Sequence, residues 1–405
     1  MPSAVASSKE QPSAEPSRPL HIGRKFDGST IDLTKIDELT DPKRKEFLIN
    51  FAPMRGMLRP LLKREVDLPI LYVMMSLTCT VVPLTLMLWY CEWHGDILSA
   101  RGMHALGVLR VVLGVVQTEG FVLGIHYSSH KRIFAARFAF LDHWVHTVLS
   151  PLIGFPSNAY LAHHVLMHHK EDNALWYDAS STMPFQRDSW FHLLLYIVRY
   201  IALIQFELPV ALMLRGRYRA TGVMLAGYGT WFAVTWYGMK VMPFTAGYGL
   251  LVPFVFLSVA AMRGNNLQHI FVSPDEPDCD FKLCYDIVND PSNCGKFLDS
   301  FHVEHHVSPA THWSDLPQKF IEFLPRHRDR DSFIFDSVHP DTVSWYVMTG
   351  QLESLAVLLA RGEQEGTRAK RQPCSMSIAC LEQRGGREGG RSSRARTHLS
   401  YECQR

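Results

Sequence analysis

Long apolar stretches alternate with polar segments along this chain, and the alternation predicts a helical membrane protein. The first stretch covers about Leu68–Cys91 and the second about Met103–Ile125. Each is long enough to cross a bilayer core of ~30 Å as a helix that rises ~1.5 Å per residue. The link between them, Glu92–Gly102, is short. We therefore expect the two stretches to form a hairpin of transmembrane helices.

Three more apolar stretches follow later in the chain, at Phe191–Leu214, Thr221–Val241 and Thr245–Met262. A basic block precedes the first stretch and comprises Lys43, Arg44, Lys45, Arg55, Arg59, Lys63 and Arg64. Cytoplasmic flanks of membrane helices carry an excess of Lys and Arg. The block therefore places this end of the first hairpin in the cytosol.

Histidines gather at the edges of the apolar stretches rather than in their middles. Nine of them fall into groups with spacings that bring imidazoles to one side of a helix. These are His126 and His130 in HYSSH, His164, His168 and His169 in HVLMHH, His269 after Asn265, and His302, His305 and His306 in HVEHH.

The positions of these histidines constrain which stretches cross the membrane. If all three later stretches crossed, HVEHH would lie on the opposite side from the other groups, and one metal site could not form. We therefore expect Phe191–Leu214, which contains His192, Arg199 and Glu207, to be an interfacial or partly buried helix. Thr221–Val241 and Thr245–Met262 then form a second hairpin, which delivers His269 to the cytosolic side.

The expected fold is all-α, an integral membrane protein with four transmembrane helices in two hairpins and a cytosolic helical cap that holds the metal site. We expect a disordered segment at residues 1–40, one membrane domain at residues 41–360 and a disordered basic tail at residues 361–405. Hydrophobic residues make up 47% of the chain and charged residues 20%, which fits a membrane protein with sizeable polar parts. The net charge of +2 is too small to indicate a nucleic acid partner.

Nine imidazoles are more than one metal ion can take, so their number favours two metals. Imidazole is a neutral ligand suited to iron, zinc or copper. A four-coordinate zinc site needs only three or four ligands. Adjacent residues such as His305 and His306 diverge by ~100° around a helix, so neighbours can reach different metals. The ligand set, together with the lipid setting, favours iron.

Other histidines compete for these roles. His163 is an alternative first ligand in place of its neighbour His164. His143 and His146 fit second-sphere groups, extra ligands or ordinary core histidines.

Two charged residues fall inside the second apolar stretch, where charge is costly. Glu119 shares a helical stripe with His126 and His130, so it is either a hydrogen-bond partner of a ligand imidazole or a protonated carboxyl in a helix contact. Arg110 lies on the opposite stripe, and we expect it to snorkel outward.

The order and spacing of the histidine groups resemble the membrane fatty acid desaturase family. That family carries the boxes H-x3/4-H, H-x2/3-H-H and H/Q-x2/3-H-H after hairpins of transmembrane helices, and HYSSH, HVLMHH and HVEHH fit them in order. Asn265 and His269 resemble the N-x3-H element of the stearoyl-CoA desaturase type, in which the His is a ligand and the Asn holds a metal-bound water. The resemblance covers roughly Leu68 to Pro325.

The resemblance implies an enzyme in which the nine histidines hold two iron ions and O2 is used to introduce a double bond into a lipid acyl chain. It implies no catalytic residue beyond the metal ligands. Asp172, after the second box, is an expected second-sphere group. The chain has no His-Pro-Gly-Gly haem signature, so we expect electrons from a separate carrier, cytochrome b5 or ferredoxin. The expected location is the endoplasmic reticulum membrane, ahead of a plastid membrane.

Two other functions fit the same residues. A lipid or carotenoid hydroxylase or ketolase with the same centre would insert oxygen instead of forming a double bond. A non-enzymatic protein that stores, senses or transports metal is the second alternative. Transporters usually place their ligands near the bilayer midplane, whereas these histidines flank the apolar stretches.

Overall fold

The computed structural model describes residues 52–359, except 176, 274–275, 277–278 and 291. Helices dominate this part of the chain, and its sheet pairs two short parallel strands, β1 (Asp286–Val288) and β2 (Ile334–Asp336). The expected all-α membrane fold is therefore confirmed. The segments expected to be disordered, 1–40 and 361–405, lie outside the described residues, as does the start of the basic block at 43–45.

The first hairpin forms where the sequence predicts it. α3 (Leu68–His94) ends at Gly95, whose φ of 74° suits a left-handed helix cap. After a short turn, the hydroxyl of Ser99 accepts from a backbone N–H in the first turn of α4 (Ala100–Val115) and so caps that helix. These two signals fix the ends of the link between the apolar stretches.

The second expected span, Met103–Ile125, consists of two helices rather than one. α5 (Thr118–His130) leaves α4 at an angle of 51°. Gly120 and Gly124 allow α5 to approach α3 closely, because a Cβ on either glycine would lie 3.3 Å from a side-chain atom of α3. Small residues four apart are a common means of close helix packing in membranes.

α10 (Trp190–Leu214) covers the apolar stretch that the sequence predicts to be an interfacial or partly buried helix. It is long and apolar enough to cross a membrane, as are the helical segments Glu65–His94 and Pro243–Gln268. The bent pair of α4 and α5 qualifies when it is counted as one span. The charges that argued against crossing, Arg199 and Glu207, bind each other at 2.6 Å, so each is neutralised within the helix.

α11 (Tyr218–Val241) covers the apolar stretch predicted to begin the second hairpin. It is a continuous helix of 24 residues, yet it is not among the described helices apolar enough to qualify as a span. Three further elements follow it without a polar interruption, namely α12 (Pro243–Ala246), the π-helix η6 (Gly247–Leu251) and α13 (Val252–Gln268).

Arg110 is buried among the long helices and does not snorkel, contrary to expectation. Its side chain is 1% exposed. The guanidinium donates to the hydroxyl of Thr85 at 3.2 Å, to the carbonyl of Gly249 in η6 at 3.0 Å and to the carbonyl of Leu152. Such carbonyls are open at helix ends and at π-turns, where the regular ladder is broken. Arg110 therefore links α4 to three neighbouring elements.

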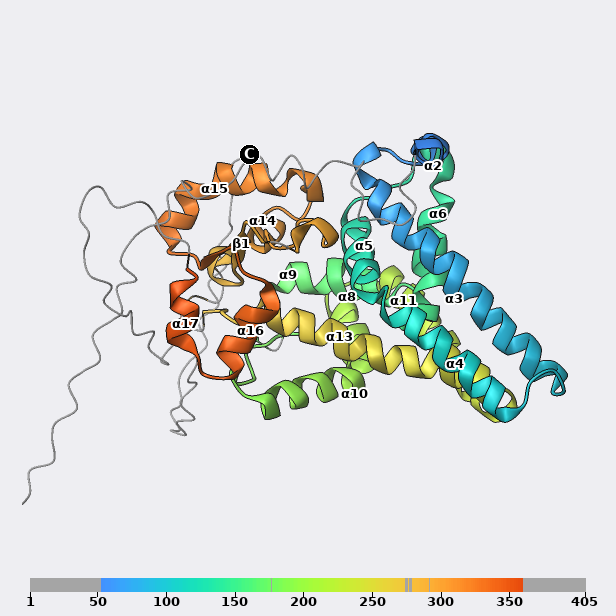
Figure 1. The fold of residues 1–405 in the computed structure, drawn as a ribbon. Helices are drawn as coiled ribbons and strands as arrows, with labels where there is room; N and C mark the ends of the chain where they lie inside the picture. Colours follow the sequence, from blue (N-terminus) through green and yellow to red (C-terminus); the bar gives the residue numbers. More distant parts are fainter. Residues whose placement is uncertain (1–51, 176, 274–275, 277–278, 291, 360–405) are drawn as a thin grey trace, which may run out of the picture.

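Short helices and the sheet form a cap at one end of the long helices (Figure 1). Figure 1 shows α14 to α17 and β1 at this end, while α3 and α4 extend away from it. The remaining elements are α2 (Ala52–Leu58), η1 (Arg59–Leu61), η2 (Glu65–Asp67), η3 (Ala136–Phe138), α6 (Phe140–His143), η4 (Trp144–Leu149), α7 (Ser150–Ile153), α8 (Ala159–His163), η5 (His164–His168), α9 (His169–Glu171), η7 (Asp280–Lys282), η8 (Asn293–Gly295), α14 (His302–Val307), η9 (Trp313–Asp315), α15 (Leu316–Arg330), α16 (Pro340–Met348) and α17 (Leu352–Val357).

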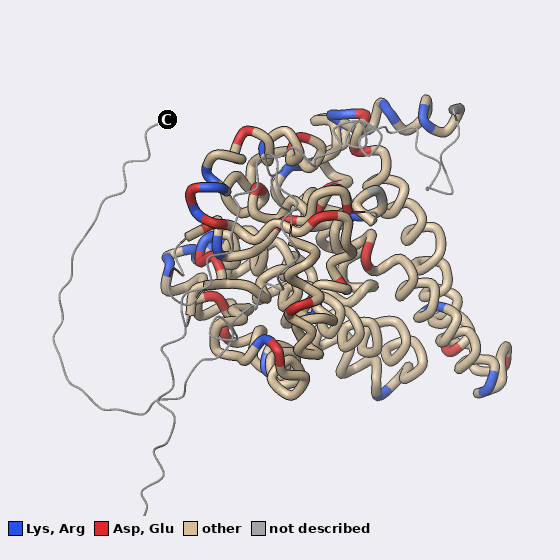
Figure 2. The backbone as a smooth tube through the Cα atoms, turned by 60° about the vertical axis from the view of Figure 1, so that its left-hand side comes forward, with Lys and Arg blue, Asp and Glu red and all other residues tan. Residues whose placement is uncertain are grey.

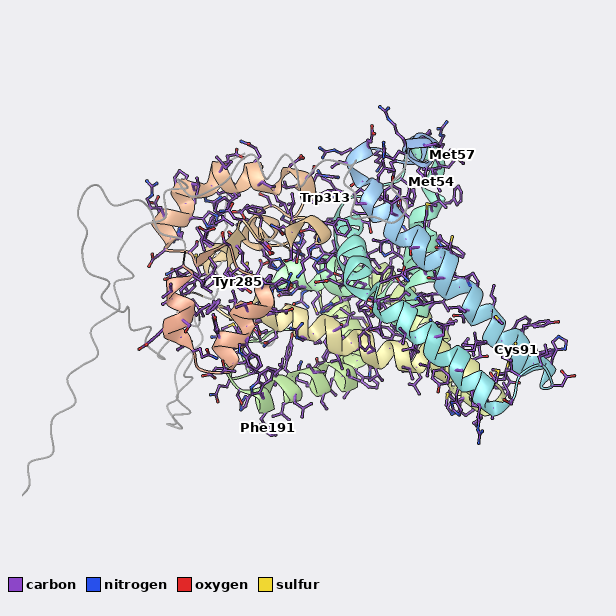
Figure 3. The ribbon with its side chains drawn as sticks, in the orientation of Figure 1. Met54, Met57, Cys91, Phe191, Tyr285 and Trp313 are labelled. Atoms are coloured by element: carbon purple, nitrogen blue, oxygen red, sulfur yellow. The ribbon has the colours of Figure 1, made fainter. Side chains whose placement is uncertain are left out.

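The surface of the long helices is that of a membrane protein. Lys, Arg, Asp and Glu gather around the cap and are sparse along the long helices (Figure 2). At the outer end of α3, which Cys91 marks in Figure 3, the aromatic residues Trp89, Tyr90 and Trp93 are exposed. Exposed Trp and Tyr at such an end are typical of a membrane–water interface.

Candidate metal centre

The nine histidines predicted as ligands converge in one buried region at the base of the cap. His126 and His130 come from the last turns of α5, and His269 directly follows α13. The others come from η5, α9 and α14 and are His164, His168, His169, His302, His305 and His306.

The histidines divide into two groups, each compact enough for one metal ion. In the first group the ligand nitrogens of His126, His130, His164, His169 and His305 lie within 4.8 Å of one another. In the second group, His168, His269 and His306 satisfy the same limit. The His302 ring lies 4.9 Å from that of His306 and 5.5 Å from that of His269, so it adjoins the second group. Neighbouring histidines belong to different groups, as expected. His169 and His305 are in the first group, whereas His168 and His306 are in the second.

A π-helical turn arranges the second histidine box. η5 (His164–His168) is π-helical, with the i to i+5 hydrogen-bond register of that helix. This wider turn brings His169 over His164, five residues earlier, with their Nε2 atoms 3.2 Å apart. His163 is buried but belongs to neither group, and its ring lies against Tyr200 at 5.5 Å. The structure thus places His164, rather than His163, with the other candidate ligands.

Hydrogen bonds orient the imidazoles of the second group through their Nδ1 atoms. His168 Nδ1 lies 2.7 Å from a carboxylate oxygen of Asp178, and His269 Nδ1 lies 3.1 Å from the carbonyl of Leu283. His306 Nδ1 lies 3.4 Å from Asp172, as the sequence predicts for that carboxylate. Such partners fix the tautomer of a metal-binding histidine and leave Nε2 free to bind.

Several ring nitrogens of these histidines are free to bind a metal ion. The Nε2 atoms of His269, His302 and His306 are buried and have no hydrogen-bond partner among the described residues. In the first group, His126 Nε2 lies 2.6 Å from His305 Nε2. Two imidazole nitrogens face each other at this distance only when a proton or a cation lies between them. The donor set therefore fits metal ions better than an ordinary polar core, where buried polar atoms are paired.

Burial keeps these imidazoles in the form that binds metal. It lowers the pKa of His164, His169 and His305 well below the ordinary value, and neighbouring histidines lower it further. These rings are therefore neutral near pH 7. Burial opposes ionisation of Asp178, but the adjacent His168 outweighs it and lowers the pKa of that carboxyl. Burial raises the pKa of Asp172 to about 6.

Asp178 was not predicted from the sequence. It lies in the loop after α9, where its carboxylate also accepts from the backbone N–H and the hydroxyl of Ser180 at 2.8 Å and 2.6 Å. Its only signal in the sequence is a carboxylate followed by Ala-Ser-Ser-Thr, which is common in turns.

Replacing Asp178 with Asn should lower metal affinity, or any activity that depends on the metal, by roughly 10- to 100-fold, the usual cost of losing an outer partner of a metal-bound histidine. The change preserves shape but removes the charge that orients His168. Turnover in isolated membranes, normalised to protein level, measures the effect. Asp188→Asn, in the same segment, should leave activity near wild type; an equal loss in both variants would contradict this role for Asp178.

Of two other residues predicted to lie near the ligands, Asn265 does so and Glu119 does not. Asn265 lies beside the second group, where its amide donates to Tyr196 at 2.7 Å and to the carbonyl of Ser180 at 3.0 Å. Glu119 makes no hydrogen bond to a histidine among the described residues, contrary to one expectation, and is not buried, contrary to the other. Its carboxylate lies 3.1 Å from Lys296 and is 67% exposed, because the bend between α4 and α5 carries it to the protein surface.

A cavity of about 550 Å³ runs past the histidines between α5 and α13. Its lining includes the apolar side chains Val115, Phe155, Phe256 and Val259. The histidines on its wall are His126, His163, His164, His168 and His302. The lining also includes the charged residues Glu119, Arg263, Lys296, Asp299 and Asp341. This size and mixture of linings are typical of a ligand site.

The convergence of the histidines also constrains the topology. The ends of α5, α9 and α13 meet at one site, so they share one face of the membrane. The chain therefore crosses the membrane an even number of times between His169 and His269. If α13 provides one crossing, only one of α10 and α11 provides the other.

Comparison with known protein families finds a match over the part of the chain that carries the histidines. The family model described as fatty acid desaturase matches residues 102–333, which is more than half of the chain and includes all nine histidines. No curated protein matches the chain.

Proposed function

Because the chain belongs to the fatty acid desaturase family, we propose that it is an O2-dependent membrane oxidoreductase that forms a double bond in a lipid acyl chain. Membership supports a desaturase-like lipid oxidoreductase in general. The finer proposal rests on the cavity, which brings an apolar wall suited to an acyl chain beside both histidine groups. In this reaction two adjacent methylene groups lose two hydrogens, and O2, with two electrons and two protons from outside, leaves as two waters.

We propose that two iron ions are the cofactors. The residues that would hold them are His126, His130, His164, His169 and His305 for one, and His168, His269, His302 and His306 for the other. Bound there, iron would supply the O2 activation that an unactivated C–H bond requires.

The protein's own residues would position the reactants. Apolar side chains such as Val115 and Phe256 would hold the acyl chain and exclude water from it. Asp178 and Asp172 would keep His168 and His306 in their binding orientation. Asn265, fixed through its amide nitrogen, would hold a water beside the second group.

The electron donor and the compartment are further parts of the proposal. We propose that electrons come from a separate donor, cytochrome b5 or ferredoxin. We propose the endoplasmic reticulum as the location, with a plastid membrane as the alternative. The cap would face the donor, because it carries the histidines and most of the charged residues (Figure 2).

Expression in a yeast host, followed by mass analysis of total lipid, tests the proposed reaction. We expect a new acyl species two hydrogens lighter than its precursor, which disappears in the double variant His305→Ala, His306→Ala. A product that instead gains an oxygen atom would contradict desaturation and support a hydroxylase or ketolase. Unchanged lipids from a well-expressed, iron-containing protein would favour a non-enzymatic metal protein.

Replacing Ala260 with Trp should shift the product profile toward shorter acyl chains. Ala260 lies on α13 in the cavity wall, so the larger side chain would fill space that we assign to the lipid tail. Val255→Trp on the same helix is a matched control, because Val255 is exposed and does not line the cavity. Fatty acid methyl ester profiles of the two variants measure the effect, and identical profiles would show that the chain does not bind there.

A further inference from the structure

A third buried group of ionisable side chains lies outside both histidine groups. It consists of Asp286 on β1, Glu304 on α14 and His327 on α15. Their exposed fractions are 0%, 0% and 2%. One ligand atom of each lies within 4.8 Å of the others. Glu304 is the acidic residue of HVEHH, and nothing in the proposed reaction uses it.

The atoms of this group are held in place, but several lack a partner. His327 Nε2 lies 2.6 Å from Glu304 Oε1 and 3.6 Å from Asp286 Oδ2. The other oxygen of Asp286 accepts from the backbone N–H of Val303 at 2.9 Å. Asp286 Oδ2, Glu304 Oε2 and His327 Nδ1 are buried and accept no hydrogen bond from a described N–H or hydroxyl group, and the Asp286 and Glu304 carboxyl groups can bond each other only when one of them holds a proton.

The charge of this group is also unbalanced. Neither carboxylate pairs with a Lys or Arg among the described residues, and aromatic rings cover the imidazole, Phe281 at 4.8 Å and Phe320 at 5.1 Å. Burying a carboxylate charge that no positive charge compensates costs several kcal/mol, on the order of a large part of a protein's stability. The two negative charges must therefore be neutralised by protons or by a cation.

We propose that Asp286, Glu304 and His327 bind one divalent transition-metal ion of the zinc class, separate from the metal ions of the nine histidines. One imidazole and two carboxylates are a suitable ligand set for such an ion. A divalent charge balances both carboxylates, and their free oxygens become ligands. None of the three residues lines the cavity, so the ion is structural. It ties β1 and α15 to the back of α14, whose other face carries three of the candidate iron ligands.

Elemental analysis of the purified full-length protein tests this proposal. We expect one zinc-class ion per chain in addition to the iron of the histidine groups. Asp286→Asn and His327→Gln should each lose this ion while the iron content stays at the wild-type value. Asp290→Asn is the matched control, because Asp290 is an equally buried cap carboxylate that binds Ser292 and Ser300 instead. It should retain every ion.

A wild-type protein that contains only the iron of the histidine groups would overturn the proposal, as would variants with an unchanged metal content. X-ray absorption at the zinc edge of the wild type decides the matter if the variants do not fold. One imidazole with oxygen neighbours supports the site, whereas several imidazoles or sulfur neighbours overturn it. The outcome is separable from the proposed function, because a protein with the zinc-class ion but no iron would contradict only the desaturase proposal.

Discussion

Replacing His164 with Ala is expected to abolish iron binding and lipid desaturation together, whereas the same change at the adjacent His163 should leave the iron content at the wild-type value. His164 belongs to the five-histidine group, and its Nε2 faces that of His169. His163 is equally buried but lies outside both groups. Loss of an outer partner of a metal ligand costs about 10- to 100-fold, so loss of a ligand itself should exceed about 100-fold.

Fatty acid methyl ester profiles from yeast that expresses each variant measure this difference, and iron content of the purified proteins accompanies them. His164→Ala should lose iron as well as product. The adjacent variant controls for the removal of a buried imidazole from this helix. Equal losses of iron and product in the two variants would show that His164 is not distinguished from His163 as a metal ligand.

The Arg110→Ala variant should be strongly destabilised, although this residue lies far from the chemistry. The change removes three hydrogen bonds and leaves the carbonyls of Leu152 and Gly249 without their buried donor. Each unsatisfied buried group costs about 1–3 kcal/mol, so the two carbonyls should cost about 2–6 kcal/mol. At about 2–4 °C per kcal/mol for a large domain, the lower end alone corresponds to a fall in Tm of roughly 4–8 °C.

Thermal unfolding of the purified protein in detergent measures this effect. Arg101→Ala provides the control, since Arg101 is exposed in the first turn of the same helix. Its Tm should stay within about 2 °C of wild type, as is usual for surface changes. An unchanged Tm for Arg110→Ala would mean that the arginine contributes little to helix packing.

The arrangement of the histidines could be predicted because its signals are local. The spacings in HYSSH and HVEHH place side chains on one helical side, and the positions beside apolar stretches place them at a membrane edge. The separation of His305 from His306 follows from the angle between neighbours on any helix. These features need no knowledge of the tertiary packing.

The choice between His163 and His164 could not be made in this way. It depends on whether the helix at this box has α-helical or π-helical hydrogen bonds, and the sequence HHVLMHH is compatible with both. The packing of the neighbouring elements selects the π-register of η5. The contact between His168 and Asp178 likewise depends on how the loop after α9 folds back onto η5.

The burial of Arg110 could not be predicted from the pattern of apolar and charged positions either, since the sequence favoured a side chain that reaches the surface. Arg199 and Glu207, the charges that favoured an interfacial position for α10, pair with each other. In each case the fold supplies polar partners inside the protein, either carbonyls of neighbouring elements or an opposite charge two turns away. The cost of such charges depends on those partners, which the sequence pattern does not show.

The central claim is that two histidine groups each hold an iron ion. The Mössbauer spectrum of the purified protein, loaded with ⁵⁷Fe, tests it most directly. The two groups differ in the number and arrangement of their imidazoles, so we predict two iron signals of equal area, both of which change when O2 is added to the reduced protein. A protein that binds no iron, or a single type of iron that does not respond to O2, would contradict the account.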